Sequence, residues 1–125
     1  MTGRGGDSGR RRQALGRGRR AEALAALFLA CKGYRIVKRS YRTRAGEIDI
    51  VAERGKTLAM VEVKYRPRKA LAAWSITPAQ RRRIELCARG FIAAHPRYAG
   101  HYIRFDAVLM APWRRPTHLT DAWRS

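Results

Sequence analysis

The architecture of this chain follows from two adjoining stretches, GEIDIVAE at residues 46–53 and LAMVEVKY at residues 58–65. Apolar residues recur at alternate positions in both stretches, as they do in half-buried β-strands. The segment Arg54-Gly55-Lys56 between them is predicted to form a turn. We therefore expect an antiparallel hairpin in which each strand has one purely apolar face.

The two faces of this hairpin are expected to differ in chemistry. Its apolar face would consist of Ile48, Ile50, Ala52, Ala59, Val61 and Val63. Its opposite face would carry four charged residues, Glu47, Asp49, Glu62 and Lys64. Burying both apolar faces together requires a loop of even length, and such a loop also gathers the four charges. A two-residue loop at residues 54–55 sets Glu47 opposite Glu62, whereas a four-residue loop sets Asp49 opposite Glu62.

Two helices are predicted on either side of the hairpin in the sequence. The first covers residues 15–32 and stops at Gly33. Its apolar positions at helical spacing are Leu24, Leu27, Phe28 and Cys31. The second begins at Thr77, which with Gln80 fits a capping box, and ends at Pro96. Its expected buried stripe consists of Ile84, Cys87, Ala88, Phe91 and His95.

The remaining strands complete an α/β fold. They are predicted over residues 34–41, 102–110 and 118–123. The order helix, three strands, helix, strand predicts a single α/β sandwich in which helices flank a mixed central sheet. Residues 1–14 are rich in glycine and arginine, so we expect a disordered basic tail there and a folded domain over residues 15–125.

The chain is strongly basic. Its 125 residues contain 28 Lys and Arg against 9 Asp and Glu, for a formal net charge of +19. Seven arginines and one aspartate in the first twenty residues leave +13 for the other 105. The folded part is therefore itself polycationic, which predicts a polyanionic partner such as nucleic acid or anionic lipid.

Cysteine usage and hydropathy indicate a cytoplasmic protein without a membrane span. Cys31 and Cys87 do not form a CxxC pair or a disulfide framework, which favours a reducing compartment. No stretch approaches the roughly 20 apolar residues that a membrane span requires. The three histidines lack metal-ligand spacing with the cysteines, so a zinc site is not expected.

Acidic residues are scarce, yet three of the nine meet at the hairpin, namely Glu47, Asp49 and Glu62. Opposed carboxylates repel unless a cation lies between them, and Mg²⁺ or Mn²⁺ is the natural one. Lys64 would lie about 7 Å beyond Glu62 on the same face, within reach of a phosphate oxygen or a metal-bound water. The alternative is an exposed face with a cross-strand ion pair. Glu47 is interpreted either as a neighbour of the metal ligands or as a solvated partner of Lys64, and we favour the second.

A fourth acidic candidate lies in the first helix. Glu22 is the only charged residue between Ala21 and Cys31, and it projects on the side of small residues that would let the helix lie close to a sheet. Its location in the first turn could reflect only the helix dipole. We interpret it instead as a candidate third acid of the site.

Four motifs carry a resemblance to a known family: YRTR at residues 41–44, GEID at 46–49, VEVK at 61–64 and RFD at 104–106. With them the chain resembles the bacterial YraN-type family, a group similar to Holliday junction resolvases in the PD-(D/E)xK nuclease-like superfamily. The resemblance covers residues 16–123 and implies a restriction-endonuclease-like sandwich. This implied fold agrees with the α/β sandwich that the periodicity of the sequence predicts.

The resemblance also implies roles for individual residues. Asp49 and Glu62 would hold the metal ion with help from the Val63 carbonyl. Lys64 would orient the attacking water, and Glu22 would complete the acids. The chain departs from the family at two positions, because the family usually has Asn where Ser40 stands and commonly Lys where Gln80 stands.

Basic residues supply the expected nucleic-acid surface. Arginines in the first turn of a helix oppose its dipole, which makes a phosphate-binding patch a better explanation than a solvated face. The predicted contacts are Arg42, Arg44, Arg66, Arg68, Lys69, Arg81, Arg82 and Arg83.

The predicted function is a Mg²⁺- or Mn²⁺-dependent endonuclease on branched or structured DNA, with DNA favoured over RNA. A homodimer would be needed to cut both strands of a junction. One alternative is a catalytically inactive binding module for nucleic acid or ribonucleoprotein that keeps the fold. Another is association of the arginine-rich N-terminus with anionic membranes.

Overall fold

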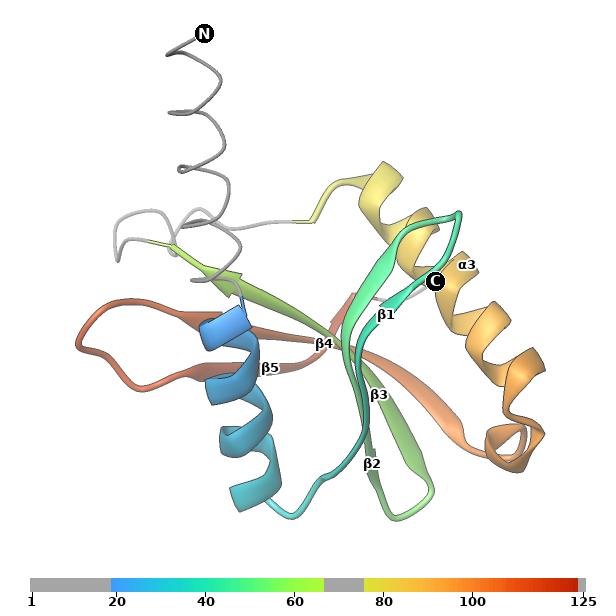
Figure 1. Cartoon of the computed structure of the whole chain (residues 1–125), viewed down its shortest axis with the longest axis horizontal. Helices are drawn as coiled ribbons and strands as arrows, with labels where there is room; N and C mark the ends of the chain where they lie inside the picture. The colour runs from blue at the N-terminus through green and yellow to red at the C-terminus, as the bar shows by residue number, and fades with distance from the viewer. Residues whose placement is uncertain (1–18, 67–75, 124–125) are drawn as a thin grey trace, which may run out of the picture.

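A five-stranded sheet forms the centre of the protein (Figure 1), in the order β1-β2-β3-β4-β5. The structure is a computed structural model that describes residues 19–66 and 76–123. The strands are β1 (Arg35–Arg42), β2 (Glu47–Arg54), β3 (Thr57–Tyr65), β4 (Tyr102–Met110) and β5 (Thr117–Trp123). Among these five described strands only the β3–β4 pair is parallel, so the predicted mixed sheet is confirmed.

In the part of the chain that the structure describes, one helix packs on each face of the sheet, as Figure 1 shows. The N-terminal helix is described over residues 19–31, and α3 spans Pro78–Ala94 on the other face. A short 3-10 turn, η1 (Pro96–Tyr98), follows α3. The predicted order of elements is confirmed, and each predicted strand boundary lies within one residue of the observed one. No helix among the described residues has the length and apolar character needed to cross a bilayer.

Each face of the sheet buries its own core. Residues packed with α3 include Ile48, Val51, Leu58, Met60, Ile84, Cys87 and Phe91. Residues packed with the N-terminal helix include Ala21, Ala25, Leu29, Ile50, Ala52, Ala59 and Val61. Because the second set is rich in alanine, the N-terminal helix can approach the sheet closely, and this brings its side chains near the strands.

The buried face of the N-terminal helix differs from the predicted apolar stripe. Leu24 and Leu27 are 54% and 62% exposed, and Cys31 is exposed as well. Alanines at positions 21, 25 and 26 face the sheet with Leu29 instead. Both the predicted leucine stripe and the observed alanine stripe have helical spacing, so periodicity alone does not distinguish them. The face of small residues is the one that packs against the sheet.

The second helix has the predicted cap. Thr77 Oγ1 accepts a hydrogen bond from Gln80 N–H at 3.2 Å, and Thr77 N–H donates to Gln80 Oε1 at 3.0 Å. Four of the five residues in the predicted stripe are buried, namely Ile84, Cys87, Ala88 and Phe91. His95 was wrongly included, because it is the C-cap residue and is exposed, with its ring stacked on Phe91.

The β2–β3 hairpin turns at Gly55 and Lys56, so its loop has two residues. This loop lies one position later in the sequence than the predicted two-residue loop at residues 54–55. The observed pairs run from Arg54–Thr57 to Ile50–Val61. Extending this register sets Asp49 opposite Glu62. The even register is confirmed, and its alignment is the one that the four-residue alternative gives.

The strict alternation of β2 breaks at Asp49. Ile50 packs with Val61 under the N-terminal helix, whereas Ile48 packs under α3. The prediction that both share a face is therefore wrong. Pairing with β3 ends at Ile50, and the Asp49 carboxylate accepts the Val63 N–H at 2.8 Å. A side chain thus takes the place of a backbone partner where β2 stops pairing with β3.

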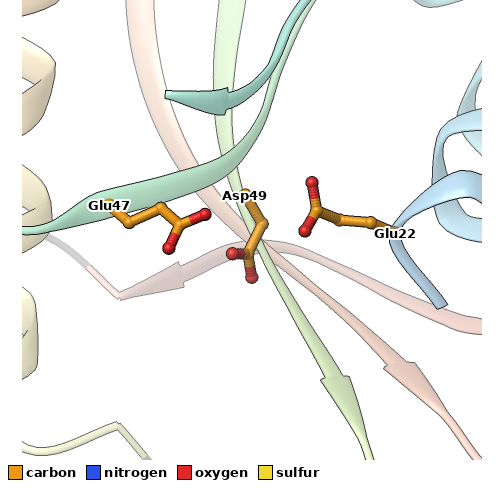
Figure 2. A group of neighbouring side chains, drawn as sticks. All are labelled: Glu22, Glu47 and Asp49. Atoms are coloured by element: carbon orange, nitrogen blue, oxygen red, sulfur yellow. The ribbon is translucent and has the colours of Figure 1, made fainter. Parts of the chain in front are cut away.

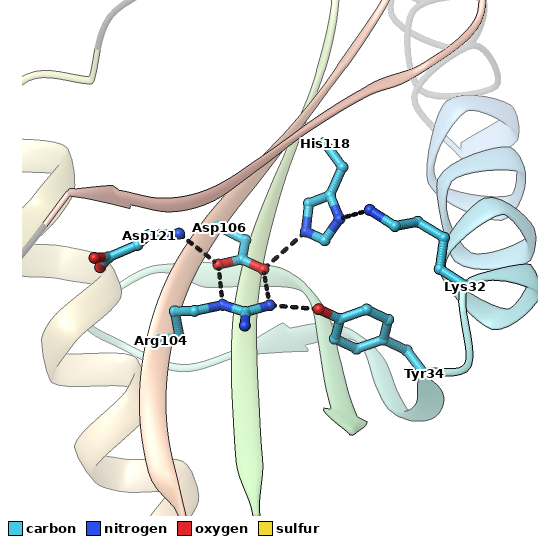
Figure 3. A network of polar contacts seen from close by, with 6 residues as sticks. All are labelled: Lys32, Tyr34, Arg104, Asp106, His118 and Asp121. Carbon is cyan, nitrogen blue, oxygen red and sulfur yellow. Dashed lines mark hydrogen bonds and ion pairs between the residues drawn. The ribbon is translucent and has the colours of Figure 1, made fainter. Parts of the chain in front are cut away.

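Asp106 is the only charged residue among those described that is fully buried. Figure 3 shows the network around it. Its carboxylate accepts hydrogen bonds from Arg104 Nε at 2.8 Å, Arg104 Nη2 at 2.7 Å, His118 Nε2 at 2.8 Å and Asp121 N at 3.0 Å. His118 Nδ1 lies 2.5 Å from Lys32 Nζ, and because an ammonium can only donate, the His118 Nε2 carries the proton given to Asp106. The RFD motif therefore has a structural role, joining the sheet to the end of the N-terminal helix.

Candidate functional site

Three carboxylates converge beside the break in β2 (Figure 2). Glu22 comes from the N-terminal helix, and Glu47 and Asp49 come from β2. Each offers one oxygen, and these oxygens lie within 4.8 Å of one another. All three residues are half-buried. Among the described residues this is the one group of His, Cys, Asp or Glu side chains close enough to hold a metal ion together.

Asp49 lies at the centre of this acidic cluster. Burial raises its pKa from 3.8 to about 8, and the negative charge of Glu62 contributes next. The hydrogen bond from Val63 N–H lowers the pKa but does not compensate, and Glu22 and Glu47 raise it further. An ionised Asp49 therefore lacks sufficient positive charge around it in the metal-free protein.

Glu62 and Lys64 form an ion pair beside the cluster. Lys64 Nζ lies 3.0 Å from Glu62 Oε1, and each side chain is 17% exposed. The expectation that Lys64 pairs with Glu47 is wrong. Glu47 belongs to the acidic cluster and lies 3.6 Å from the guanidinium of Arg42. The ladder between β2 and β3 has ended by this point, so Glu47 is not held opposite Lys64.

Ser40 holds one acid in place. Its Oγ donates a hydrogen bond to Glu22 Oε1 at 2.7 Å, which links β1 to the N-terminal helix. Its φ is +52°, in the left-handed region that Asn adopts more readily than Ser. The residue was not predicted as part of the site. The family preference for Asn at this position was a signal for it.

Ser40→Asn is expected to stabilise the protein by up to about 1 kcal/mol, because Asn pays less for the left-handed conformation and can still donate to Glu22. Ser40→Ala keeps the strain and loses the donor, so it is expected to destabilise by about 1 kcal/mol. Urea unfolding followed by circular dichroism measures both. Equal midpoints for the two variants would contradict this account.

A hollow of about 230 Å³ opens next to the acids. It is lined by Gly46, Glu47, Glu62, Gln80, Arg83 and Ile84. Gly46 has a φ of +153°, and a Cβ there would come within 3.3 Å of the Arg83 Cβ. This glycine therefore allows α3 to approach the turn before β2. The approach brings one arginine of the predicted basic patch to the edge of the acidic cluster.

The other predicted basic contacts have varied positions. Four of them are exposed, namely Arg42, Arg44, Arg66 and Arg82. Arg81 is half-buried, and its Nε has no hydrogen-bond partner among the described residues. Arg68 and Lys69 lie outside the described residues, as does the predicted tail.

A larger hollow, of about 450 Å³, lies elsewhere along α3. Its lining consists of Glu85, Ala88, Arg89, Ile92, Ala93, Ile103 and Phe105. With one carboxylate and one guanidinium in an otherwise apolar lining, it has no convergent set of reactive groups. The smaller hollow beside the acids is the better candidate for chemistry.

Comparison with known proteins identifies the family. The model of the Uncharacterised protein family UPF0102 matches residues 21–110. This chain belongs to UPF0102. A UPF0102 protein from Methylocella silvestris is 52% identical over 116 residues, covering 93% of this chain and 94% of the relative. One from Parvibaculum lavamentivorans is 50% identical over 107 residues, covering 86% and 80%. The predicted YraN-type membership is thereby confirmed.

The UPF0102 match includes the whole acidic cluster. Glu22 lies near its first residue, and the hairpin with Glu47, Asp49, Glu62 and Lys64 lies inside it. Strand β5 lies beyond its end. Membership of UPF0102 by itself identifies no reaction, because function depends on the site rather than on the fold.

Proposed function

We propose that this UPF0102 protein is a metal-dependent endonuclease that hydrolyses phosphodiester bonds in branched or structured DNA. The observation that carries the proposal is the convergence of Glu22, Glu47 and Asp49 at the end of a hairpin that also presents Lys64. A protein with a net charge of +19 has few acidic residues to place, and clustering them is costly without a cation.

The donor set fits a hard divalent cation such as Mg²⁺ or Mn²⁺. Carboxylate oxygens are the ligands that these ions prefer, and the raised pKa of Asp49 indicates a site short of positive charge. Asp49 with Glu22 and Glu47 would hold the ion, and Glu62 and the Val63 carbonyl are further candidate ligands from β3. When bound, such an ion polarises a phosphoryl group and lowers the pKa of water.

The chain's own residues would position the other participants. Lys64 is held beside the cluster by Glu62 and would orient the attacking water or contact a phosphate oxygen. Arg83 lines the adjoining hollow, where its guanidinium can bind a phosphate through paired N–H groups. Ser40 would keep Glu22 aimed at the cluster.

The nuclease proposal is tested with purified protein, Mg²⁺ or Mn²⁺, and end-labelled junction, flap and single-stranded DNA. The wild type is expected to nick at least one substrate. Asp49→Asn and Lys64→Ala are expected to lose at least about 100-fold in rate while still binding DNA. Glu85→Gln is the control, because it removes one negative charge as Asp49→Asn does, but outside the acidic cluster. This variant is expected to retain the nicking rate. Identical products from every variant would contradict the proposal.

DNA affinity is expected to fall steeply with salt, because each neutralised phosphate releases counterions. If six phosphates are contacted, binding weakens about 1000-fold between 50 and 200 mM salt. Fluorescence anisotropy of a labelled junction measures this in EDTA, which prevents cleavage. A flat dependence would contradict nucleic-acid binding by the basic surface.

The inactive binding module is the second candidate, and the same +19 charge supports it. It predicts tight DNA or ribonucleoprotein binding with no nicking by the wild type. Paired cuts in a junction would require a homodimer, since the described residues contain one acidic cluster. A cytoplasmic location is proposed from the two free cysteines.

A further inference from the structure

The connection between β4 and β5 exposes a tryptophan completely. Trp113 is the most exposed of the large hydrophobic side chains described, at its full accessible area. Its φ is +61°, a conformation that bulky residues rarely adopt. Exposure of a large ring and backbone strain in one residue both cost free energy, and such strain is concentrated at functional positions.

The sequence around Trp113 is basic and stiff. The connection reads Pro112-Trp113-Arg114-Arg115-Pro116, and both arginines are exposed. The prolines restrict the backbone on either side of the ring. An aromatic face beside two guanidinium groups matches single-stranded nucleic acid, whose bases stack on aromatic rings while arginines contact the phosphates.

The connection emerges at the same end of the sheet as the proposed catalytic lysine. In the parallel β3–β4 pair, Lys64 lies beside Leu109 and Tyr65 beside Met110. Figure 1 shows this connection beyond the carboxyl end of β3. Trp113 lies four positions after Leu109, so their backbones lie within about 14 Å. Ligands of α/β proteins bind outside this end of parallel strands.

We infer that Trp113 stacks on an unpaired base of the substrate while Arg114 and Arg115 contact its phosphates. The substrate class is therefore DNA with unpaired bases close to the scissile phosphate, because bases within a duplex are already stacked on each other. This inference rests on the proposed function, to which it adds the feature that the protein recognises.

The test measures binding of the full chain to two labelled DNA probes in EDTA. One is a continuous duplex, and the other has the same length with an unpaired gap of several bases. Trp113→Ala is expected to weaken binding to the gapped probe about 5- to 100-fold and to the duplex less than about 2-fold. Trp113→Tyr is expected to restore most of the affinity. Tyr102→Ala is the matched control, because Tyr102 is 58% exposed at the opposite end of β4.

Each outcome supports or overturns the inference. Selective loss on the gapped probe with rescue by tyrosine supports it. Unchanged affinity of Trp113→Ala for the gapped probe overturns it and leaves the proposed function intact. Failure of the wild type to bind either probe overturns the nucleic-acid proposal itself. Binding of phosphatidylserine vesicles that Trp113→Ala abolishes, with gapped-probe affinity unchanged, would make the connection a membrane contact instead.

Discussion

The metal-free protein is expected to lose stability steadily as the pH rises from about 4 to about 8. Burial, with the charge of Glu62 as the next cause, raises the pKa of Asp49 from 3.8 to about 8 in the folded chain. Between these values the unfolded chain releases the Asp49 proton and the folded chain keeps it. The stabilisation that protonated Asp49 gives the folded chain is fully present below pH 4 and is lost above pH 8. Between these limits the free energy of unfolding falls by up to about 1.4 kcal/mol for each pH unit.

Urea unfolding in EDTA at pH 5, 6, 7 and 8 measures this slope. Asp49→Asn is expected to flatten it, because the amide does not titrate, and Glu85→Gln is expected to retain it. Mg²⁺ or Mn²⁺ binding at pH 7 is expected to release close to one proton, seen by calorimetry in buffers of different ionisation enthalpy. Equal slopes for wild type and Asp49→Asn would show that Asp49 is not the titrating group.

The sequence predicts the hairpin well because one physical requirement controls it. Burial of Ile50 with Val61 fixes an even register, and the same register brings Asp49 opposite Glu62. The exact turn is less constrained, because two loops of different length satisfy that requirement. Capping of α3 at Thr77 was also predictable, since its signal lies within four consecutive residues.

Other features depend on packing that no short stretch of sequence encodes. Alternation predicted Ile48 on the face of Ile50, but the Asp49 side chain replaces a ladder partner and the strand changes faces there. Periodicity predicted the leucines of the first helix as buried. The alanines of this helix pack against the sheet instead, because their small side chains let the helix lie close to it. Ser40 enters the site only through a left-handed backbone conformation.

Loss of the Asp106 carboxylate is expected to cause one of the largest losses of stability available in this chain. Asp106 is inaccessible to solvent, and Arg104 binds it through two nitrogens. Burial alone would raise its pKa, but hydrogen bonds from His118, Arg104 and the Asp121 N–H outweigh burial and hold the pKa below its ordinary value. This contribution is present above pH 4 and is lost as the pH falls below it, a window separate from that of Asp49.

Asp106→Ala leaves a half-buried guanidinium and a buried imidazole without their partner, so we expect a loss of about 3–5 kcal/mol at pH 7. Asp106→Asn keeps the volume and one acceptor, and it should lose less. Glu53→Gln is the comparison, because Glu53 pairs with the exposed Arg35 and with His101, and the amide keeps the volume and one acceptor oxygen, so it should lose less stability than Asp106→Ala. Urea unfolding measures all three. If Asp106→Ala cost no more than Glu53→Gln, the buried network would be dispensable, and the RFD motif would need a role at the carboxylate cluster rather than in the fold.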